Sequence, residues 1–180
     1  MQQLRGTTLK RFARDFRREH PLEHDVVLVL QSVAYPVNVG SLFRIADACR
    51  VSEVVLTGIT PTPPNATISK VGRNRDHDVR WRYVEQAEDV LADLRREGYH
   101  VCAVEITDQA VPYFVRAYPD RLCLVVGNED HGVTRGALAQ CDSAVFVPMY
   151  GKGRSLNVHV SAAVVLYHLR HADFVREGGA

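Results

Sequence analysis

Three glycine-bearing segments hold most of the polar side chains that could do chemistry in this chain. They read QSVAYPVNVGSLFR, GNEDHGVTRG and MYGKGRSLN, and each directly follows a short apolar run. Small polar side chains beside a helix start, together with its free backbone N–H donors, form a binding place for a polar ligand. The residues of interest in these segments are Asn38, Gly127, Ser155 and Asn157.

Each of these segments also has a purely structural explanation when it is taken alone. Asn38 and Ser155 are residue types that cap helix N-termini, and Gly127 is typical of a turn. What favours a functional site is that all three segments occupy equivalent places, directly after separate strand-like runs. If those strands are parallel, their carboxyl ends lie at one edge of the sheet and the three segments converge there.

The elements that must position these segments follow an alternation of two periods. Helix-like stretches with apolar residues at 3.6-residue spacing separate short runs rich in β-branched residues. The runs are continuously apolar, as expected of strands covered on both faces. The sequence therefore predicts an α/β fold with a Rossmann-like parallel sheet flanked by helices. The predicted strands are 26–30, 53–58, 100–106, 122–127 and 144–148, and the predicted helices are 39–50, 85–98, 134–141 and 155–174.

Several well-known site types are missing from this framework. The first predicted strand is not followed by GxGxxG, and the chain has neither GxxxxGK[ST] nor a GxSxG elbow, which argues against nicotinamide-Rossmann, P-loop and hydrolase chemistry. His168 and His171 share a helix face without a third ligand, so we expect no metal. The four cysteines lack metal-ligand spacing and are expected to be buried free thiols.

Composition predicts one globular domain. The chain has 180 residues, of which 46% are hydrophobic and 24% charged, and its net charge is +1. The apolar runs are too short for a membrane span, and charges stand where a secretory signal needs an apolar stretch, so we expect a cytoplasmic protein without a membrane partner.

Basic residues are nevertheless concentrated in two clusters. The segment LKRFARDFRREH has the apolar spacing of an amphipathic helix and predicts a basic helical arm over residues 1–22, ahead of the main domain at 23–180. The second cluster is SKVGRNRDHDVRWR, in which Trp81 stands between two cations and which Tyr83 directly follows. Cations with aromatic rings favour a polyanion partner, although one such cluster alone is more often a solvated face. The predicted contact residues are Lys10, Arg11, Arg14, Arg18, Lys70, Arg73 and Arg75.

At this point the residues resemble a known family. The segments NVGSLFRIADA, LVVGNEDHGVT and VFVPMYGKGRSLNVHVSAAVVLYH are similar, in this order, to the three motifs of SpoU/TrmH-like RNA ribose 2'-O-methyltransferases of the SPOUT superfamily, and the likeness runs from about residue 24 to about residue 170. The resemblance implies a C-terminal deep trefoil knot, S-adenosylmethionine as cofactor, a homodimer, and methylation of a ribose 2'-hydroxyl in tRNA or rRNA. Which RNA and which nucleotide is methylated stays open.

The resemblance also assigns roles to individual residues. It places Asn38 and Arg44 at the acceptor ribose and its phosphate, and Glu129, Ser155 and Asn157 beside them in the catalytic pocket. The residues that it implies for cofactor binding are Val104, Gly127, Asn128, Val147, Met149, Ser155, Leu156 and Asn157. Within the family the Arg is often assigned as the general base. A guanidinium has no acceptor atom, so we favour Arg44 as a phosphate clamp and alkoxide stabiliser, with a phosphate oxygen or water assisting proton removal.

The chain departs from the family pattern at a few positions, among them Arg50 and His159, where a glycine and a small residue are usual. Two other functions are considered. A non-catalytic RNA-binding module on the same scaffold would not need the four residues Arg44, Glu129, Ser155 and Asn157 together. A nucleotide-dependent oxidoreductase would need the missing glycine fingerprint.

Overall fold

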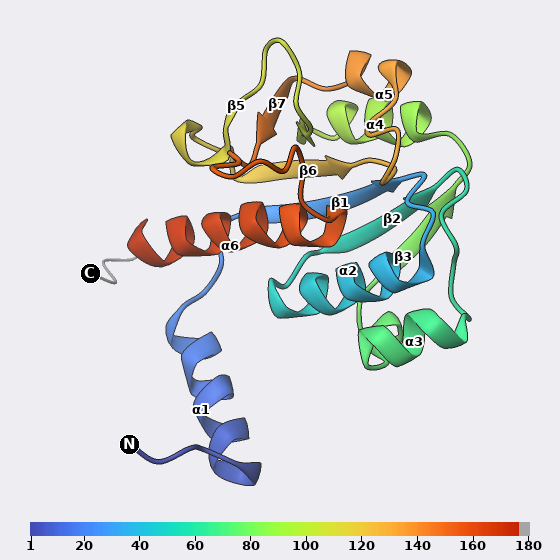
Figure 1. Cartoon of the computed structure of the whole chain (residues 1–180). Coiled ribbons are helices and arrows are strands. Elements are labelled where there is room, and N and C mark those ends of the chain that lie inside the picture. Colours follow the sequence, from blue (N-terminus) through green and yellow to red (C-terminus); the bar gives the residue numbers. More distant parts are fainter. Residues whose placement is uncertain (177–180) are drawn as a thin grey trace.

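The computed structural model describes residues 1–176, which form a seven-stranded sheet with helices on both faces (Figure 1). Every strand pair in the sheet is parallel, which confirms the predicted α/β fold. In chain order the strands are β1 (Asp25–Gln31), β2 (Glu53–Thr57), β3 (Trp81–Val84), β4 (His100–Val104), β5 (Val111–Pro112), β6 (Arg121–Val126) and β7 (Ser143–Phe146). Their order across the sheet is β3-β2-β1-β6-β4-β7-β5.

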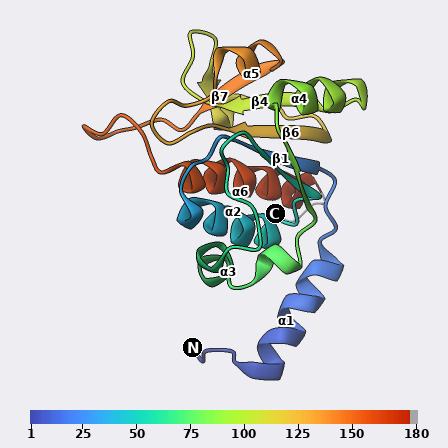
Figure 2. The same ribbon diagram turned by 90° about the vertical axis from the view of Figure 1, so that its right-hand side faces the viewer.

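Two hydrophobic cores lie on opposite faces of this sheet. Helices α2 (Pro36–Ala48), α3 (Ala66–Gly72) and α6 (Val158–Arg176) cover one face, and α4 (Ala87–Arg96) and α5 (Arg135–Ala139) cover the other (Figure 2). Alternate side chains of each central strand enter the two cores: Leu28 packs toward α2 and α6, whereas Val29 packs toward α4. Burial on both faces explains why the strand sequences are continuously apolar.

Two strands and one α-helix of the structure, β3, β5 and α3, were not predicted from the sequence. Strand β3 reads WRYV and lies at the sheet edge, so its charged and aromatic residues resemble a basic surface segment. Strand β5, at the other edge, has only two residues, one of them proline. Helix α3 follows a proline-rich loop. The local signal for its start is the N-cap residue Asn65, whose side chain accepts hydrogen bonds from the backbone N–H groups of Thr67 and Ile68.

Helix α1 (Gly6–Glu19) is amphipathic, as its spacing predicts, but buries no residue of its own. It stands away from the sheet, at the end where β1 begins (Figure 1). Its contact with α6 includes Phe16, whose ring lies parallel to that of Phe174 with centroids 6.5 Å apart. No helix within residues 1–176 is long and apolar enough to cross a membrane.

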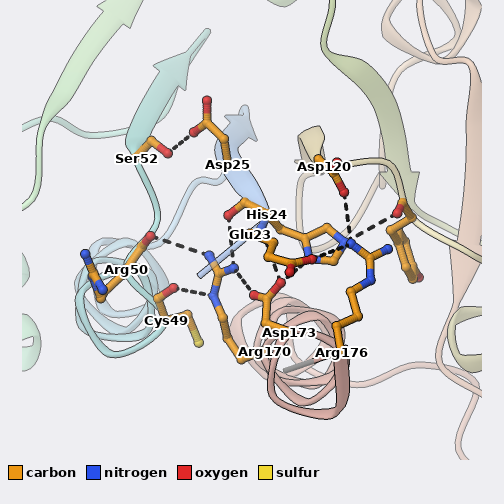
Figure 3. Close-up of polar contacts among 11 residues, drawn as sticks. Glu23, His24, Asp25, Cys49, Arg50, Ser52, Asp120, Arg170, Asp173 and Arg176 are labelled. Carbon is orange, nitrogen blue, oxygen red and sulfur yellow. Dashed lines mark hydrogen bonds and ion pairs between the residues drawn. The ribbon is translucent and has the colours of Figure 1, made fainter. Parts of the chain in front are cut away.

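A buried polar network fastens the end of α6 to the start of β1 (Figure 3). Asp173, which is fully buried, accepts hydrogen bonds from the His24 backbone (3.2 Å) and from Arg170 (2.8 Å), and it also contacts the His24 ring. Arg170 donates to the carbonyl oxygen of Cys49 at 2.7 Å and so reaches the end of α2. The network holds α6 in register across the sheet, with its first turn close to the loops at the other end of the strands.

Candidate functional site

A cavity of about 480 Å³ opens at the carboxyl ends of β4, β6 and β7, and all three predicted segments contribute to its wall. Asn38 enters from α2, the segment 127–132 comes from the loop after β6, and the segment 154–157 comes from the loop before α6. Nine residues that the sequence predicts for the site line this cavity: Asn38, Val104, Gly127, Asn128, Glu129, Val147, Ser155, Leu156 and Asn157.

Two predicted site residues, Arg44 and Met149, do not line the cavity. Arg44 is exposed on α2, and no residue within 1–176 forms an ion pair or hydrogen bond with its guanidinium. It follows Asn38 by six positions, which places it about 240° farther around the helix axis. Met149 is half-buried in the loop after β7, and its methyl group lies near Gly153.

Glu129 joins the loop after β6 to the beginning of α2. Its carboxylate accepts hydrogen bonds from the backbone N–H of Ala34 (2.9 Å), from the backbone N–H of Tyr35 (3.3 Å) and from Asn38 Nδ2 (2.6 Å). Partial burial acts to raise the pKa of Glu129, but the hydrogen bonds from Asn38, Ala34 and Tyr35 outweigh it and lower this pKa. Glu129 is therefore an ionised acceptor that holds Asn38 against the cavity.

Asn128 closes the loop in which Glu129 lies. Its Nδ2 donates to the carbonyl oxygen of Ser32 at 2.8 Å, while its Oδ1 accepts from the backbone N–H groups of Asp130 (3.0 Å) and His131 (3.1 Å). The side chain is thus committed to the loop's own backbone and to the end of β1. It shapes the cavity wall with its amide oxygen and one of its two N–H bonds occupied.

Gly127 is required where β6 ends because the chain folds back tightly on itself. A Cβ atom at this position would overlap the backbone of Gly132 and Val133. The Val133 N–H in turn donates to Glu105 Oε2 at 2.9 Å, which connects the loop to the end of β4. A side chain at position 127 would therefore displace the backbone that forms the cavity floor.

The segment RSLN stands slightly before the helix that it was expected to begin. Helix α6 starts at Val158, and the carbonyl oxygen of Asn157 accepts from the N–H groups of Val160 (2.9 Å) and Ser161 (3.0 Å). Asn157 is thus the last residue before the helix. Ser155 is an exposed loop residue that lines the cavity instead of capping α6.

Some residues of the site were missed by sequence reasoning. Glu105 and Arg154 both line the cavity. Glu105 was placed inside the predicted strand 100–106, whereas β4 ends at Val104 and leaves Glu105 in the loop that follows. His159 Nδ1 lies 3.0 Å from Asn38 Oδ1, a contact between residues 121 positions apart. Sequence position alone gives no signal for that contact, although His159 was noted as a departure from the family pattern.

The cavity has the mixed character needed by a ligand that carries both charges and an apolar ring. The acidic residues Glu105, Glu129 and Asp130 line it together with the basic residue Arg154 and the apolar residue Leu156. Carboxylates favour a cationic centre, and a guanidinium pairs with a ligand carboxylate. Within residues 1–176 there is no group of three or more side chains suited to hold a metal ion.

The predicted RNA-contact residues around α3 differ in how far neighbouring acids neutralise them. Lys70 and Arg73 are exposed, and neither has an ion-pair partner within residues 1–176. Arg75 pairs with Asp47 at 3.7 Å and with Asp78. Lys70 and Arg73 are thus the cations of this cluster that are free to contact a polyanion.

The cations of α1 show the same division. Lys10 and Arg11 are exposed without an ion pair among the residues described, whereas Arg14 and Arg18 both lie near Asp15, at 3.4 and 3.7 Å. Helix α1 lies at the opposite end of the strands from the cavity (Figure 1). Its cations therefore do not adjoin the cavity of their own chain.

Known proteins resemble this chain over most of its length. The family described as "SpoU rRNA Methylase family" matches residues 25–167. A tRNA (guanosine(18)-2'-O)-methyltransferase of Escherichia coli (strain K12) is 31% identical over 143 residues, covering 79% of this chain and 62% of the relative. The 23S rRNA (guanosine(2553)-2'-O)-methyltransferase RlmP of Bacillus subtilis is 35% identical, covering 80% of this chain and 57% of the relative.

Solved structures show the same fold. The A. aeolicus TrmH/SpoU tRNA modifying enzyme superposes with a TM-score of 0.78 at 22% identity, covering 94% of this chain and 85% of that chain. An AdoMet-bound rRNA methyltransferase from Sinorhizobium meliloti also gives a TM-score of 0.78, at 24% identity, covering 87% of this chain and 59% of that chain. The chain spans about 60% of the length of the two curated relatives described above.

Proposed function

Because the chain belongs to the SpoU rRNA methylase family, we propose that it transfers a methyl group from S-adenosylmethionine to a ribose 2'-hydroxyl of tRNA or rRNA. The observation that carries this proposal is the meeting of three separate loops at one cavity, with Glu129, Asn38 and Asn157 in its wall. Relatives named as guanosine 2'-O-methyltransferases of tRNA and of 23S rRNA support both substrate classes. The proposal includes a cytoplasmic location for the protein.

The cavity fits the proposed cofactor. S-adenosylmethionine, when bound, supplies a methyl carbon made electrophilic by the positively charged sulfur to which it is attached. The backbone around Gly127, Val147 and Leu156 would hold the adenosine, and Glu105 and Glu129 provide the negative charge that a sulfonium favours. No metal is needed for this reaction, because its electrophile is already activated.

The acceptor would lie against Asn38 and the segment before α6. A ribose hydroxyl is a poor nucleophile until it loses its proton, so the site must align its oxygen with the methyl carbon and stabilise the developing negative charge. Asn38 is held by Glu129 and presents a fixed amide dipole to the cavity. Ser155 and Asn157 line the same wall and offer further donors to the sugar.

Arg44 would act on RNA from the surface of α2. We assign it to the acceptor phosphate and to the developing alkoxide rather than to proton removal, because a guanidinium has no acceptor atom. The proton passes to a phosphate oxygen or to water. Since Arg44 does not line the cavity of its own chain, this role requires RNA that is bound over α2 or a second copy of the protein at the cavity.

The RNA backbone would leave the cavity along α2 and α3. Gly40 and Gly72 let these helices cross closely, since a Cβ on Gly40 would lie 2.7 Å from the Ile68 carbonyl oxygen. Arg44 follows Gly40 by one turn and therefore shares its helix face. The other helix of this crossing, α3, carries the free cation Lys70, and the free cation Arg73 is its C-cap residue.

A homodimer would give the basic arm a role in substrate binding. The arm, residues 1–22, would contact RNA with Lys10, Arg11, Arg14 and Arg18 while the main domain, 23–180, carries out catalysis; residues 177–180 lie outside the described part. Tyr167 on α6 is 55% exposed although its neighbours Val165 and Leu166 are buried, which supports α6 as a partner-contact helix. The arm of one subunit could then serve RNA bound at the partner.

The C-terminal segment is proposed to form the deep trefoil knot of the superfamily. Strand β7 lies between β4 and β5, yet the chain returns after the loop 147–157 as α6, which packs beside α2 beneath β1 (Figure 2). This return from the edge of the sheet to a place beside α2 supports the proposed knot.

Cofactor binding separates the enzyme from an RNA-binding module on the same scaffold. We expect isothermal titration calorimetry with S-adenosylmethionine to give saturable heat at one site per chain. The Gly127→Ala variant should give none, because its side chain displaces the cavity floor. RNA binding without any cofactor heat in the wild-type protein would favour the binding module and overturn the proposal.

A further inference from the structure

We propose that His159 is a positioning residue that fixes the orientation of the Asn38 amide at the acceptor side of the cavity, an inference that rests on the proposed function. His159 is the second residue of α6 and is half-buried. Its Nδ1 lies 3.0 Å from Asn38 Oδ1, and Asn38 Nδ2 lies 2.6 Å from Glu129 Oε1. One chain of contacts thus runs from the loop after β6, through α2, to α6.

The direction of each hydrogen bond follows from the carboxylate at one end. Glu129 is ionised and can only accept, so the Asn38 atom that faces it must be the amide nitrogen. The amide oxygen of Asn38 then faces His159. Because that oxygen can only accept, the Nδ1 atom of His159 must carry the proton.

This assignment leaves specific groups available to a ligand. The Asn38 amide has two N–H bonds and Glu129 takes one of them, so one donor remains on a residue that lines the cavity. Donation by His159 to the amide oxygen polarises that remaining N–H and strengthens it toward an oxygen of the acceptor ribose. His159 thereby acts through Asn38, without itself lining the cavity.

The first test reads the proton on His159 directly and needs no activity. In a ¹⁵N-labelled full-length protein at about pH 9, where an ordinary imidazole is neutral, long-range ¹H–¹⁵N correlation distinguishes the two histidine tautomers. We expect His159 to carry its proton on Nδ1, whereas a solvated imidazole favours Nε2. The His159→Asn spectrum identifies the signal by its disappearance. An Nε2–H tautomer at His159 would overturn the proposed bond.

The second test uses two substitutions of nearly equal shape. His159→Asn places an amide N–H where Nδ1 stood, and His159→Asp places there an oxygen that can only accept. Residue 159 lies in the first turn of α6, where a carboxylate is favoured by the helix dipole, so the Asp variant should fold as well as the Asn variant. Equal thermal midpoints would show that the two variants are equally stable, so that their kcat values can be compared directly.

We expect the Asn variant to keep kcat within about threefold of wild type and the Asp variant to lose about tenfold or more, because a misoriented amide misplaces the acceptor. S-adenosylmethionine affinity, measured by calorimetry, should be the same in both. Equal kcat values in two folded variants would contradict the positioning role. Failure of the proposed function would be distinguishable, because the wild-type protein itself would then transfer no methyl group.

Discussion

Loss of the negative charge of Glu129 should disturb the site most, even when the replacement keeps the shape of the side chain. We expect Glu129→Gln to reduce the free energy of unfolding by about 1–3 kcal/mol, because three N–H donors then face a group that is neutral and partly a donor itself. Methyl transfer should fall as well, since Asn38 loses its fixed orientation. Urea unfolding measures the first effect, with Asp108→Asn, an exposed carboxylate, as the control.

The contribution of Glu129 to stability should also depend on pH. Its pKa is lowered in the folded protein, so the contribution is fully present above the ordinary glutamate pKa of about 4.3. It is lost as the pH falls through the lowered folded value. We expect the difference in urea midpoint between wild type and Glu129→Gln to shrink below about pH 4. A difference that stays constant down to pH 3 would mean that the charge is not what the loop requires.

Residue types were easier to predict than residue contacts. Asn38, Glu129 and Asn157 could be picked out because their types and order match a family pattern. The contact between His159 and Asn38 joins residues 121 positions apart, and no local pattern encodes such a pair. Arg44 is the opposite case. The motif includes it, but it lies about 240° around the helix axis from Asn38 and therefore on another face of α2.

At the level of elements, the turn after β6 depends on one glycine. Gly127→Ala should cost about 1–3 kcal/mol of stability, because the added methyl group overlaps the backbone of Gly132. Gly151→Ala is the matched control, since a Cβ there meets nothing within 4 Å. Thermal unfolding followed by circular dichroism compares the two. Equal melting temperatures for both variants would show that the loop yields without cost.

The helix pair α2 and α3 makes a prediction about RNA. Replacing Lys70 and Arg73 with alanine should weaken RNA binding and reduce the slope of log K against log salt by up to about two, because each phosphate contact releases counterions. The double variant Arg95→Ala/Arg96→Ala on the other face of the sheet, where both residues are ion-paired, controls for charge. Fluorescence anisotropy over a salt series measures the slopes. Identical slopes for the two double variants would exclude the α3 surface.

Central strands were predicted well because burial on both faces leaves a strong signal in the sequence. The five continuous apolar runs all appear as strands, namely β1, β2, β4, β6 and β7. The edge strands β3 and β5 lack that signal, since one face or one edge of each meets solvent and their residues are charged, aromatic or proline. Helix α3 was not predicted because its first residues follow a proline-rich loop.

Across the whole molecule, the network around Asp173 sets how firmly α6 is held. Asp173→Asn should lower the free energy of unfolding by about 3 kcal/mol, because His24 and Arg170 lose a buried charged partner. Burial acts to raise the Asp173 pKa, but hydrogen bonds from His24 and Arg170 lower it. Its contribution is therefore present above the ordinary aspartate pKa of about 3.9 and is lost as the pH falls through the lowered folded value.

The matched control lies beside this network on the surface. Glu23 pairs with Arg176 at 3.1 Å (Figure 3), and both side chains are partly exposed. Glu23→Gln should leave the unfolding midpoint unchanged, as is usual for an exposed ion pair. Chemical denaturation at pH 7 and at pH 3.5 compares both variants with wild type. An Asp173→Asn protein as stable as wild type at pH 7 would show that the buried pair gives no net stabilisation.

The global arrangement was the least accessible to sequence reasoning. Alternating periods predict a parallel sheet but do not determine the strand order β3-β2-β1-β6-β4-β7-β5, because that order depends on long-range pairing. The proposed knot and the proposed dimer come from the family resemblance, since topology rules make a knot a rare exception.

The position of the transferred methyl group tests the central proposal most directly. Purified protein would be incubated with methyl-labelled S-adenosylmethionine and total tRNA or rRNA from a strain lacking the enzyme. The RNA would then be digested to nucleosides and analysed by mass spectrometry. We expect the label on a ribose 2'-oxygen and its absence when Asn38 and Glu129 are both replaced by alanine. Label found only on bases, or no label in either RNA, would contradict the proposed reaction.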